Sequence, residues 1–305
     1  MTARTVSLGA PFGWLMKAID VGRRNPRALF GGFAILLVVG LVPTVVQMLA
    51  QFALADSPAL MWTVYGLSML ASLVLMPPLT GAVIRLLHHC ETGQPASAFD
   101  VFDGYRDMAF ATRMVLTALL LLAIYVALFG LLFVLLPGKE FFVEAMARSM
   151  ATPPGGQPDM TGMPDLDPSL LPMFLAWMLG MFAVIFLMTH AYMLALNQAA
   201  LGGHGPLTAM ASGFKATLKN VLPLLGFTLA VMVIGFVVML LLVMVIALLG
   251  TVLAMVSPIL AGVVLLPMYL LAALAVYVVM FGFYYHGWRE IFGATAADPM
   301  DAIAA

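Results

Sequence analysis

The feature that most constrains this chain is a stretch of 69 residues without a charged side chain, between Lys219 and Arg289. As one straight α-helix the stretch would be about 100 Å long, whereas the hydrocarbon core of a bilayer is about 30 Å thick. It must therefore fold back once. The turn is expected between Gly250 and Pro258, where Gly, Ser and Pro interrupt the apolar run.

Composition places the whole chain in the same class. Of its 305 residues 64% are hydrophobic and 9% are charged, and the mean hydropathy is +1.09, whereas a soluble domain is about half apolar and a quarter charged. Uncharged runs long enough to cross a bilayer recur along the chain. The predicted spans are about 28–55, 60–87, 114–136, 171–196, 221–249 and 258–285. This indicates an all-α fold, a polytopic membrane helical bundle with six transmembrane helices in three hairpins.

The segments outside the spans divide the rest of the chain. Residues 1–27 are expected to be a cytoplasmic amphipathic segment, 28–288 the six-span membrane domain, and 289–305 a cytoplasmic tail, with an outer loop at 138–170. In the N-terminal segment Phe12, Leu15, Met16 and Ile19 recur at helical spacing, with charged residues on the other face. This pattern is typical of a helix that lies on a membrane surface.

Two later polar segments share a sequence pattern. Each has Pro, one residue, Ser or Thr, Ala and an apolar residue, followed after a short gap by Gly, an aromatic residue and a base. The candidate cytoplasmic surface motif comprises Pro95, Ser97, Phe99, Phe102, Gly104, Tyr105 and Arg106 in one segment and Pro206, Thr208, Met210, Gly213, Phe214 and Lys215 in the other. Ser97, with Asp100 three residues later, predicts a capped helix start. Each hairpin is thus expected to follow an amphipathic surface helix, although the repeat is weaker in the first unit.

Charge asymmetry predicts the orientation in the membrane. With the N-terminus inside, eleven Lys or Arg residues fall in cytoplasmic segments, and only Lys139 and Arg148 fall outside. An excess of bases marks the cytoplasmic side of a membrane protein. Both termini are therefore expected in the cytoplasm, and the loop 138–170 outside.

The stretches PASAFDVFDGYR (95–106), PLTAMASGFK (206–215) and YYHGWREIFG (284–293) resemble an uncharacterised six-span family of proteobacterial inner-membrane proteins. The layout is also similar to the membrane domain found beside some bacterial glycerophosphodiester phosphodiesterases. The resemblance implies a location in the bacterial inner (plasma) membrane and a topology, but no activity. The metal-binding Glu, Asp and His set of such a phosphodiesterase is not found in this sequence.

Three groups of residues have the chemistry of possible sites. Neighbours on a helix point about 100° apart, so His88-His89-Cys90 is interpreted as a span end at the polar interface rather than a metal site. His190 is expected to be a hydrogen-bonded packing residue. The spacing of Met160 and Met163 leaves a Cu(I) site open, although most other Met residues are apolar filler.

No catalytic, cofactor-binding or metal-binding residue is predicted, because the sequence lacks a phosphate-binding Gly loop, a His-Glu-x-x-His motif and a Gly-x-Ser-x-Gly elbow. The preferred hypothesis is a non-enzymatic inner-membrane protein that organises lipid or a membrane partner. The alternative is a small permease or a transporter of lipid or another hydrophobic solute. The expected partner is the lipid bilayer, with a membrane protein or a second copy of the chain left open, and no nucleic acid is expected.

Overall fold

The computed structural model describes residues 3–54, 56–135 and 171–293, and every element in this part of the chain is helical. Six helices are long and apolar enough to cross a membrane. These long helices are α2 (Pro26–Ala53), α3 (Pro58–Thr92), α5 (Met108–Leu135), α7 (Leu171–Ala200), α9 (Val221–Val256) and α10 (Pro258–Phe292). The short elements are α1 (Ala10–Ile19), the 3₁₀ helix η1 (Ala98–Phe102), α4 (Asp103–Arg106) and α8 (Pro206–Lys219).

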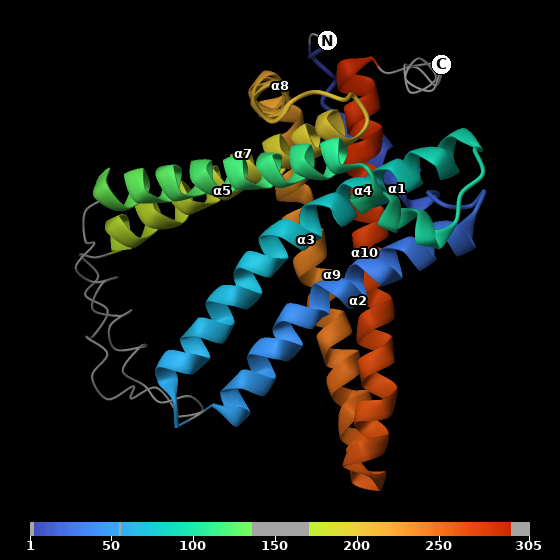
Figure 1. Ribbon diagram of the computed structural model, residues 1–305, viewed down its shortest axis with the longest axis vertical. Helices are drawn as coiled ribbons and strands as arrows, with labels where there is room; N and C mark the ends of the chain where they lie inside the picture. The colour runs from blue at the N-terminus through green and yellow to red at the C-terminus, as the bar shows by residue number, and fades with distance from the viewer. Residues whose placement is uncertain (1–2, 55, 136–170, 294–305) are drawn as a thin grey trace.

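The long helices pack in three pairs, α2 with α3, α5 with α7, and α9 with α10. Figure 1 shows the pairs diverging from one shared region, which we call the hub. The hub contains the short helices and the nearest ends of the long ones, and its buried residues include Leu29, Leu87, Phe110, Leu194 and Tyr285. The six-span count agrees with the prediction, and the long helices differ from the predicted spans chiefly by extending further at the hub.

Local sequence explains where the helices begin and end. Pro at the first turn starts α1, α2, α3, α8 and α10, where its missing N–H costs no hydrogen bond. The polar segments that follow α3, α7 and α10 each contain a Gly with positive φ, a conformation that strains other residues. These glycines are Gly93 (75°), Gly203 (65°) and Gly293 (68°). Gly93 and Gly293 cap α3 and α10 directly, whereas Gly203 lies three residues beyond the end of α7, so only the first and third of these helices end in the same way.

The uncharged stretch turns at Ser257, later than Gly250. Helix α9 continues through Gly250 to Val256, and the Ser257 side chain accepts a hydrogen bond from the backbone N–H of Leu260 to start α10. The next residue is Pro258, which favours an extended conformation at Ser257 (φ −164°, ψ 128°). Pro therefore places the turn, and Gly250 is accommodated within the helix.

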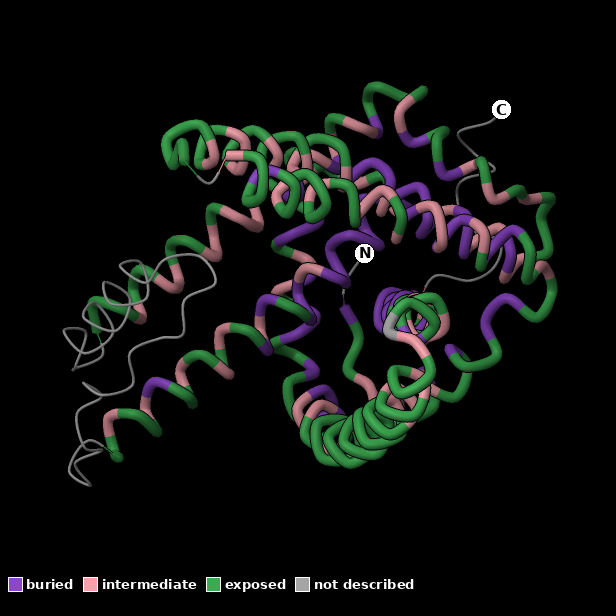
Figure 2. Tube along the Cα trace, turned by 90° about the horizontal axis from the view of Figure 1, so that it is seen from below, coloured by how far each residue is buried: buried purple, intermediate pink, exposed green. Residues whose placement is uncertain are grey.

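Burial is concentrated at the hub end of each long helix (Figure 2). In α9 the buried residues are Pro223, Leu224 and Phe227, all within its first two turns. Beyond these turns α9 carries a run of exposed apolar side chains, from Leu229 to Val256. An apolar surface of this size exceeds what soluble monomers expose and fits contact with lipid hydrocarbon.

The short helices connect the pairs in a cycle. Helix η1 and α4 follow the first pair, with η1 packed on α2 and α3 and α4 packed on α3 and α5, while α8 follows the second pair and packs on α7. Helix α1 precedes the first pair but packs on α10 of the third. Each pair also contacts the other two at the hub. Helix α1 at the N-terminus thus joins the first pair to the third and closes a ring. The other junctions of the ring join pairs that are consecutive in sequence.

Candidate functional site

The glycines of the surface motif lie where a short helix crosses a long one. A Cβ atom at Gly104 would lie 2.5 Å from the backbone oxygen of Pro78 and 3.0 Å from Ala82 Cβ. A Cβ atom at Gly213 would overlap the backbone oxygen of Ala191 and lie 3.0 Å from Ala195 Cβ. The two glycines therefore occupy equivalent crossings, and a side chain is excluded at both because backbone approaches backbone.

A third close crossing joins α1 to α10 with the roles exchanged. Here the glycine is Gly282 on the long helix, and a Cβ atom on it would lie 3.1 Å from Ala18 Cβ on the short one. One turn further along, Gly287 faces the ring of Trp14, whose Nε1 donates to Glu290 Oε2 at 2.8 Å. The residue equivalent to the motif glycines in the first unit is thus Ala18, which is why the sequence repeat is faint there.

The other motif residues divide between the hub and the surface. Ser97 and Asp100 form the predicted capping box at the start of η1, although the helix is 3₁₀ rather than α. The Tyr105 hydroxyl donates to the backbone oxygen of Leu75 at 2.5 Å, and burial raises the pKa of this phenol. Arg106 is exposed and pairs with Asp103 at 2.7 Å.

Exposure separates the apolar members of the motif. Phe99 is 71% exposed and Phe102 is 38% exposed, whereas Met210 is only 2% exposed. Phe214 is partly buried against the core of the hub. The outward face of α8 is instead marked by Leu207 and Leu218, which are 74% and 60% exposed. Pro206 is partly buried, and Pro95, Thr208 and Lys215 are exposed.

Two histidines, His190 buried and His88 half-buried, tie α10 to the other two pairs. His190 on α7 contacts Tyr284 Oη through Nδ1 at 2.9 Å and Thr228 Oγ1 through Nε2 at 3.0 Å. His88 on α3 contacts the hydroxyl of Tyr285 through Nδ1 at 2.9 Å. The structure confirms His190 as a hydrogen-bonded packing residue. The adjacent tyrosines Tyr284 and Tyr285 reach different neighbours because they point to different sides of α10.

Asparagines that precede two of the long helices were missed by the sequence analysis. Asn25 caps α2 through Ala28 N and donates to the backbone oxygen of Ala96 at 3.0 Å. Asn220 precedes α9, accepts from Val6 N at 2.8 Å and donates to the backbone oxygen of Arg4 at 3.0 Å. Both thus hold the segment that leads into the next short helix of the ring. An Asn directly before a long apolar run was the available signal.

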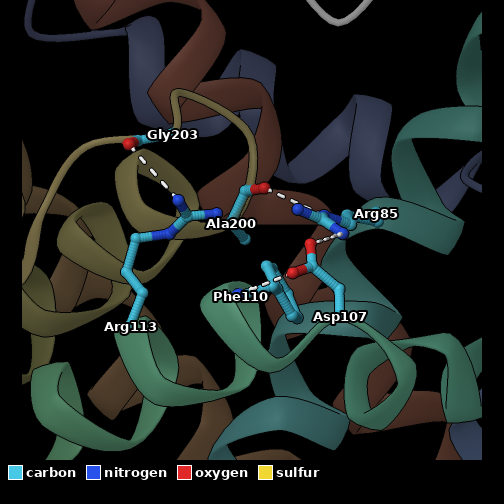
Figure 3. A network of polar contacts seen from close by, with 6 residues as sticks. All are labelled: Arg85, Asp107, Phe110, Arg113, Ala200 and Gly203. Carbon is cyan, nitrogen blue, oxygen red and sulfur yellow. Dashed lines mark hydrogen bonds and ion pairs between the residues drawn. The ribbon is translucent and has the colours of Figure 1, made fainter. Parts of the chain in front are cut away.

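A cluster of charged residues joins the first two pairs at the hub (Figure 3). The Arg85 guanidinium carbon lies 3.6 Å from the centroid of the Phe110 ring, and that of Arg113 lies 5.6 Å from it. Arg85 Nη1 lies 3.9 Å from Asp107 Oδ2, and Asp107 Oδ1 also caps α5 through Phe110 N at 3.0 Å. The cluster therefore brings two guanidinium groups and one carboxylate around a single aromatic ring.

Both arginines also donate to backbone oxygens at the end of α7. Arg85 Nε donates to Ala200 O at 3.2 Å, and Arg113 Nη1 contacts Gly203 O at 3.4 Å. Nearby, burial and then neighbouring positive charge, including Arg113, lower the pKa of His204. The lowered pKa disfavours a further positive charge on this histidine beside the cluster.

Within residues 3–54, 56–135 and 171–293, no three His, Cys, Asp or Glu side chains gather as metal ligands would. Met160 and Met163, the residues considered for Cu(I), lie outside the described residues, as does the whole of the predicted outer loop 138–170.

Comparison of the chain with protein families, curated proteins and solved structures finds no match. The resemblance to the six-span inner-membrane family therefore stays a prediction from short motifs.

Proposed function

We propose that this chain is a non-enzymatic integral protein of the bacterial inner membrane that organises lipid, or a membrane partner, at the cytoplasmic surface. Six helices are consistent with an integral membrane protein. The observation that carries the proposal is that α1, η1 and α8 each have two apolar sides. One side packs in the hub, and the other exposes large apolar side chains.

Exposure on the short elements supports a membrane surface location. In α1 the residues Trp14 and Ala18 are each 1% exposed, while Met16 is 65% exposed. Phe99 in η1 and Leu207 in α8 are exposed to a similar degree as Met16. Large apolar side chains held at the surface beside bases are typical of helices that insert into lipid headgroups.

Charge at the hub supports an anionic surface as the partner. At this end of the described residues there are eleven Lys or Arg side chains and six Asp or Glu side chains. The acids are Asp20, Glu91, Asp100, Asp103, Asp107 and Glu290. An excess of bases is attracted to the anionic cytoplasmic leaflet by about 1 kcal/mol for each base near the surface.

The outer parts of the pairs bear on the choice between an organising protein and a transporter. In Figure 1 the pair α9 and α10 runs along the long axis, whereas α5 and α7 run across it. Membrane helices tilt by roughly 0–40° from the bilayer normal. To cross one flat bilayer, the three pairs would therefore have to lie more nearly parallel to one another than they do in Figure 1. Contacts concentrated at the hub leave the outer apolar surfaces to lipid or to a membrane partner.

A path for lipid or another hydrophobic solute between the pairs is the alternative, since their facing sides are apolar. Vesicles containing the purified protein distinguish the two functions. Fluorescent lipid or solute crossing no faster than in empty vesicles supports an organising role, and faster crossing favours the transporter.

Orientation gives the first testable prediction. Reporter fusions at Gly156, Gly203 and Ala305 should report outside, inside and inside, because the bases gather on the side of the hub. A cytoplasmic signal at Gly156 would contradict the proposed topology.

Labelling of single cysteines tests the surface location. In a Cys90→Ser background, Phe99→Cys and Leu207→Cys should resist a water-soluble maleimide in vesicles opened on the cytoplasmic side, whereas Asp103→Cys and Lys215→Cys should label fast. All four positions are exposed in the protein itself, so any protection has to come from lipid. Equal labelling of the four would mean that the short elements do not enter the headgroups.

A further inference from the structure

Two arginines from different pairs mark the same depth in the membrane. The uncharged run that begins near residue 60 ends at Arg85, and the run 114–135 begins directly after Arg113. The two side chains share one ring, that of Phe110. Both are therefore placed where hydrocarbon gives way to headgroups, which is the depth of lipid phosphates.

The two guanidinium groups are close enough to act on one ligand. Their central carbons lie 3.6 and 5.6 Å from the same ring centroid, so they are no more than about 9 Å apart. Guanidinium groups bind phosphate oxygens through planar, charge-assisted hydrogen bonds. A phosphate that sits between the two could accept from both.

Positive charge in the cluster is not fully compensated. Asp107 lies 3.9 Å from Arg85, at the edge of ion-pair range, and shares its carboxylate with the cap of α5. No ion pair within 4.0 Å involves Arg113 in the described part of the chain. Arg113 Nε is also buried without a hydrogen-bond partner. An unpaired donor on a cation at the membrane boundary is costly unless an anion supplies the missing acceptor.

A purely structural role explains part of this geometry. Both arginines face backbone oxygens at the end of α7, where the helix dipole favours positive charge. That role uses Arg85 Nε and Arg113 Nη1, and the second of these contacts is long at 3.4 Å. It leaves Arg113 Nε without an acceptor, which an anionic group could supply.

We propose that Arg85 and Arg113 form a binding site for the phosphate of an anionic phospholipid of the cytoplasmic leaflet. This rests on the proposed function and names the chemistry of its lipid. The arginines stand at the depth of the lipid phosphates, and Phe110 fixes their spacing. The net charge of the cluster favours a lipid with net negative charge over a zwitterionic one.

Native mass spectrometry of the delipidated full chain tests this site. Phosphatidylglycerol, phosphatidylcholine and inorganic phosphate are added in separate arms. The wild type should retain phosphatidylglycerol in preference to phosphatidylcholine, and Arg113→Gln should weaken that retention about fivefold or more. The matched control Arg106→Gln removes a base that is exposed and paired with Asp103, and should stay within about twofold of the wild type.

Each further outcome decides the assignment. Equal retention of the two lipids by the wild type, or unchanged retention in Arg113→Gln, would overturn it. Displacement of phosphatidylglycerol by millimolar inorganic phosphate would assign the site to free phosphate instead. If Arg113→Gln does not fold, Arg113→Lys keeps the charge without the planar fork, and it should lose part of the preference.

The experiment separates failure of the site from failure of the proposed function. Loss of the lipid preference together with protected cysteines at positions 99 and 207 would remove the site and leave the surface role intact. Arg113-dependent lipid binding with unprotected cysteines would leave the site and remove the surface role.

Discussion

Alanine in place of Gly213 should sharply lower the melting temperature of the detergent-solubilised protein. Its methyl group would overlap the backbone oxygen of Ala191 and press on Ala195. Overpacking of a well-packed site costs about 1–3 kcal/mol, and here the obstacle is backbone, which yields less than a side chain. The gain in helix propensity on replacing Gly with Ala, about 0.5–1 kcal/mol, is smaller. The net effect is therefore destabilising. Gly104→Ala should act in the same direction through Pro78 O at 2.5 Å.

The matched control is Gly226→Ala in α9. A Cβ atom there meets nothing within 4 Å, so the substitution adds helix propensity without a clash. Thermal unfolding of the three variants should leave Gly226→Ala at or slightly above the wild type and the other two well below it. If all three unfold at the same temperature, the close crossings of short and long helices do not hold the hub together.

The six long helices could be predicted from the sequence because length and hydropathy suffice to identify them. The run from Lys219 to Arg289 is too long for one crossing, and any fold of it needs a turn. The capping box at Ser97 was predictable for the same kind of reason, since its partners are three residues apart in sequence. These features depend on local composition and spacing, which a single sequence displays directly.

Closure of the ring could not be predicted in this way. The contact between Trp14 and Glu290 joins residues 276 positions apart, and the hydrogen bonds of Asn220 reach back to Arg4 and Val6. No periodicity in the sequence relates such distant positions. The burial of Met210 in the hub could not be predicted for the same reason. Apolar spacing identifies the apolar face of a helix, but it does not show whether protein or lipid covers that face.

The candidate site was also only partly visible in the sequence. Gly104 and Gly213 stood out through the repeat, although the repeat alone could not say what they contact. Arg85 and Arg113 were noted only as cytoplasmic charges, because their common neighbour Phe110 becomes apparent only when α3 and α5 are brought together. Functional pairing across helices requires the tertiary arrangement.

Trp14→Ala should cause the other large loss, because this side chain closes the ring. Trp14 is 1% exposed, packs edge-on against Phe283 at 5.6 Å and donates to Glu290. Truncating a buried Trp to Ala costs about 3–5 kcal/mol, so α1 should detach from α10 and the melting temperature should fall. Trp62→Ala is the matched control, since Trp62 is 63% exposed at the far end of its pair and should be nearly silent. Protease cleavage near α1 in Trp14→Ala alone would locate the opening at the ring junction. Equal stability of the two variants would mean that α1 is dispensable and that the hub holds the three pairs without being closed.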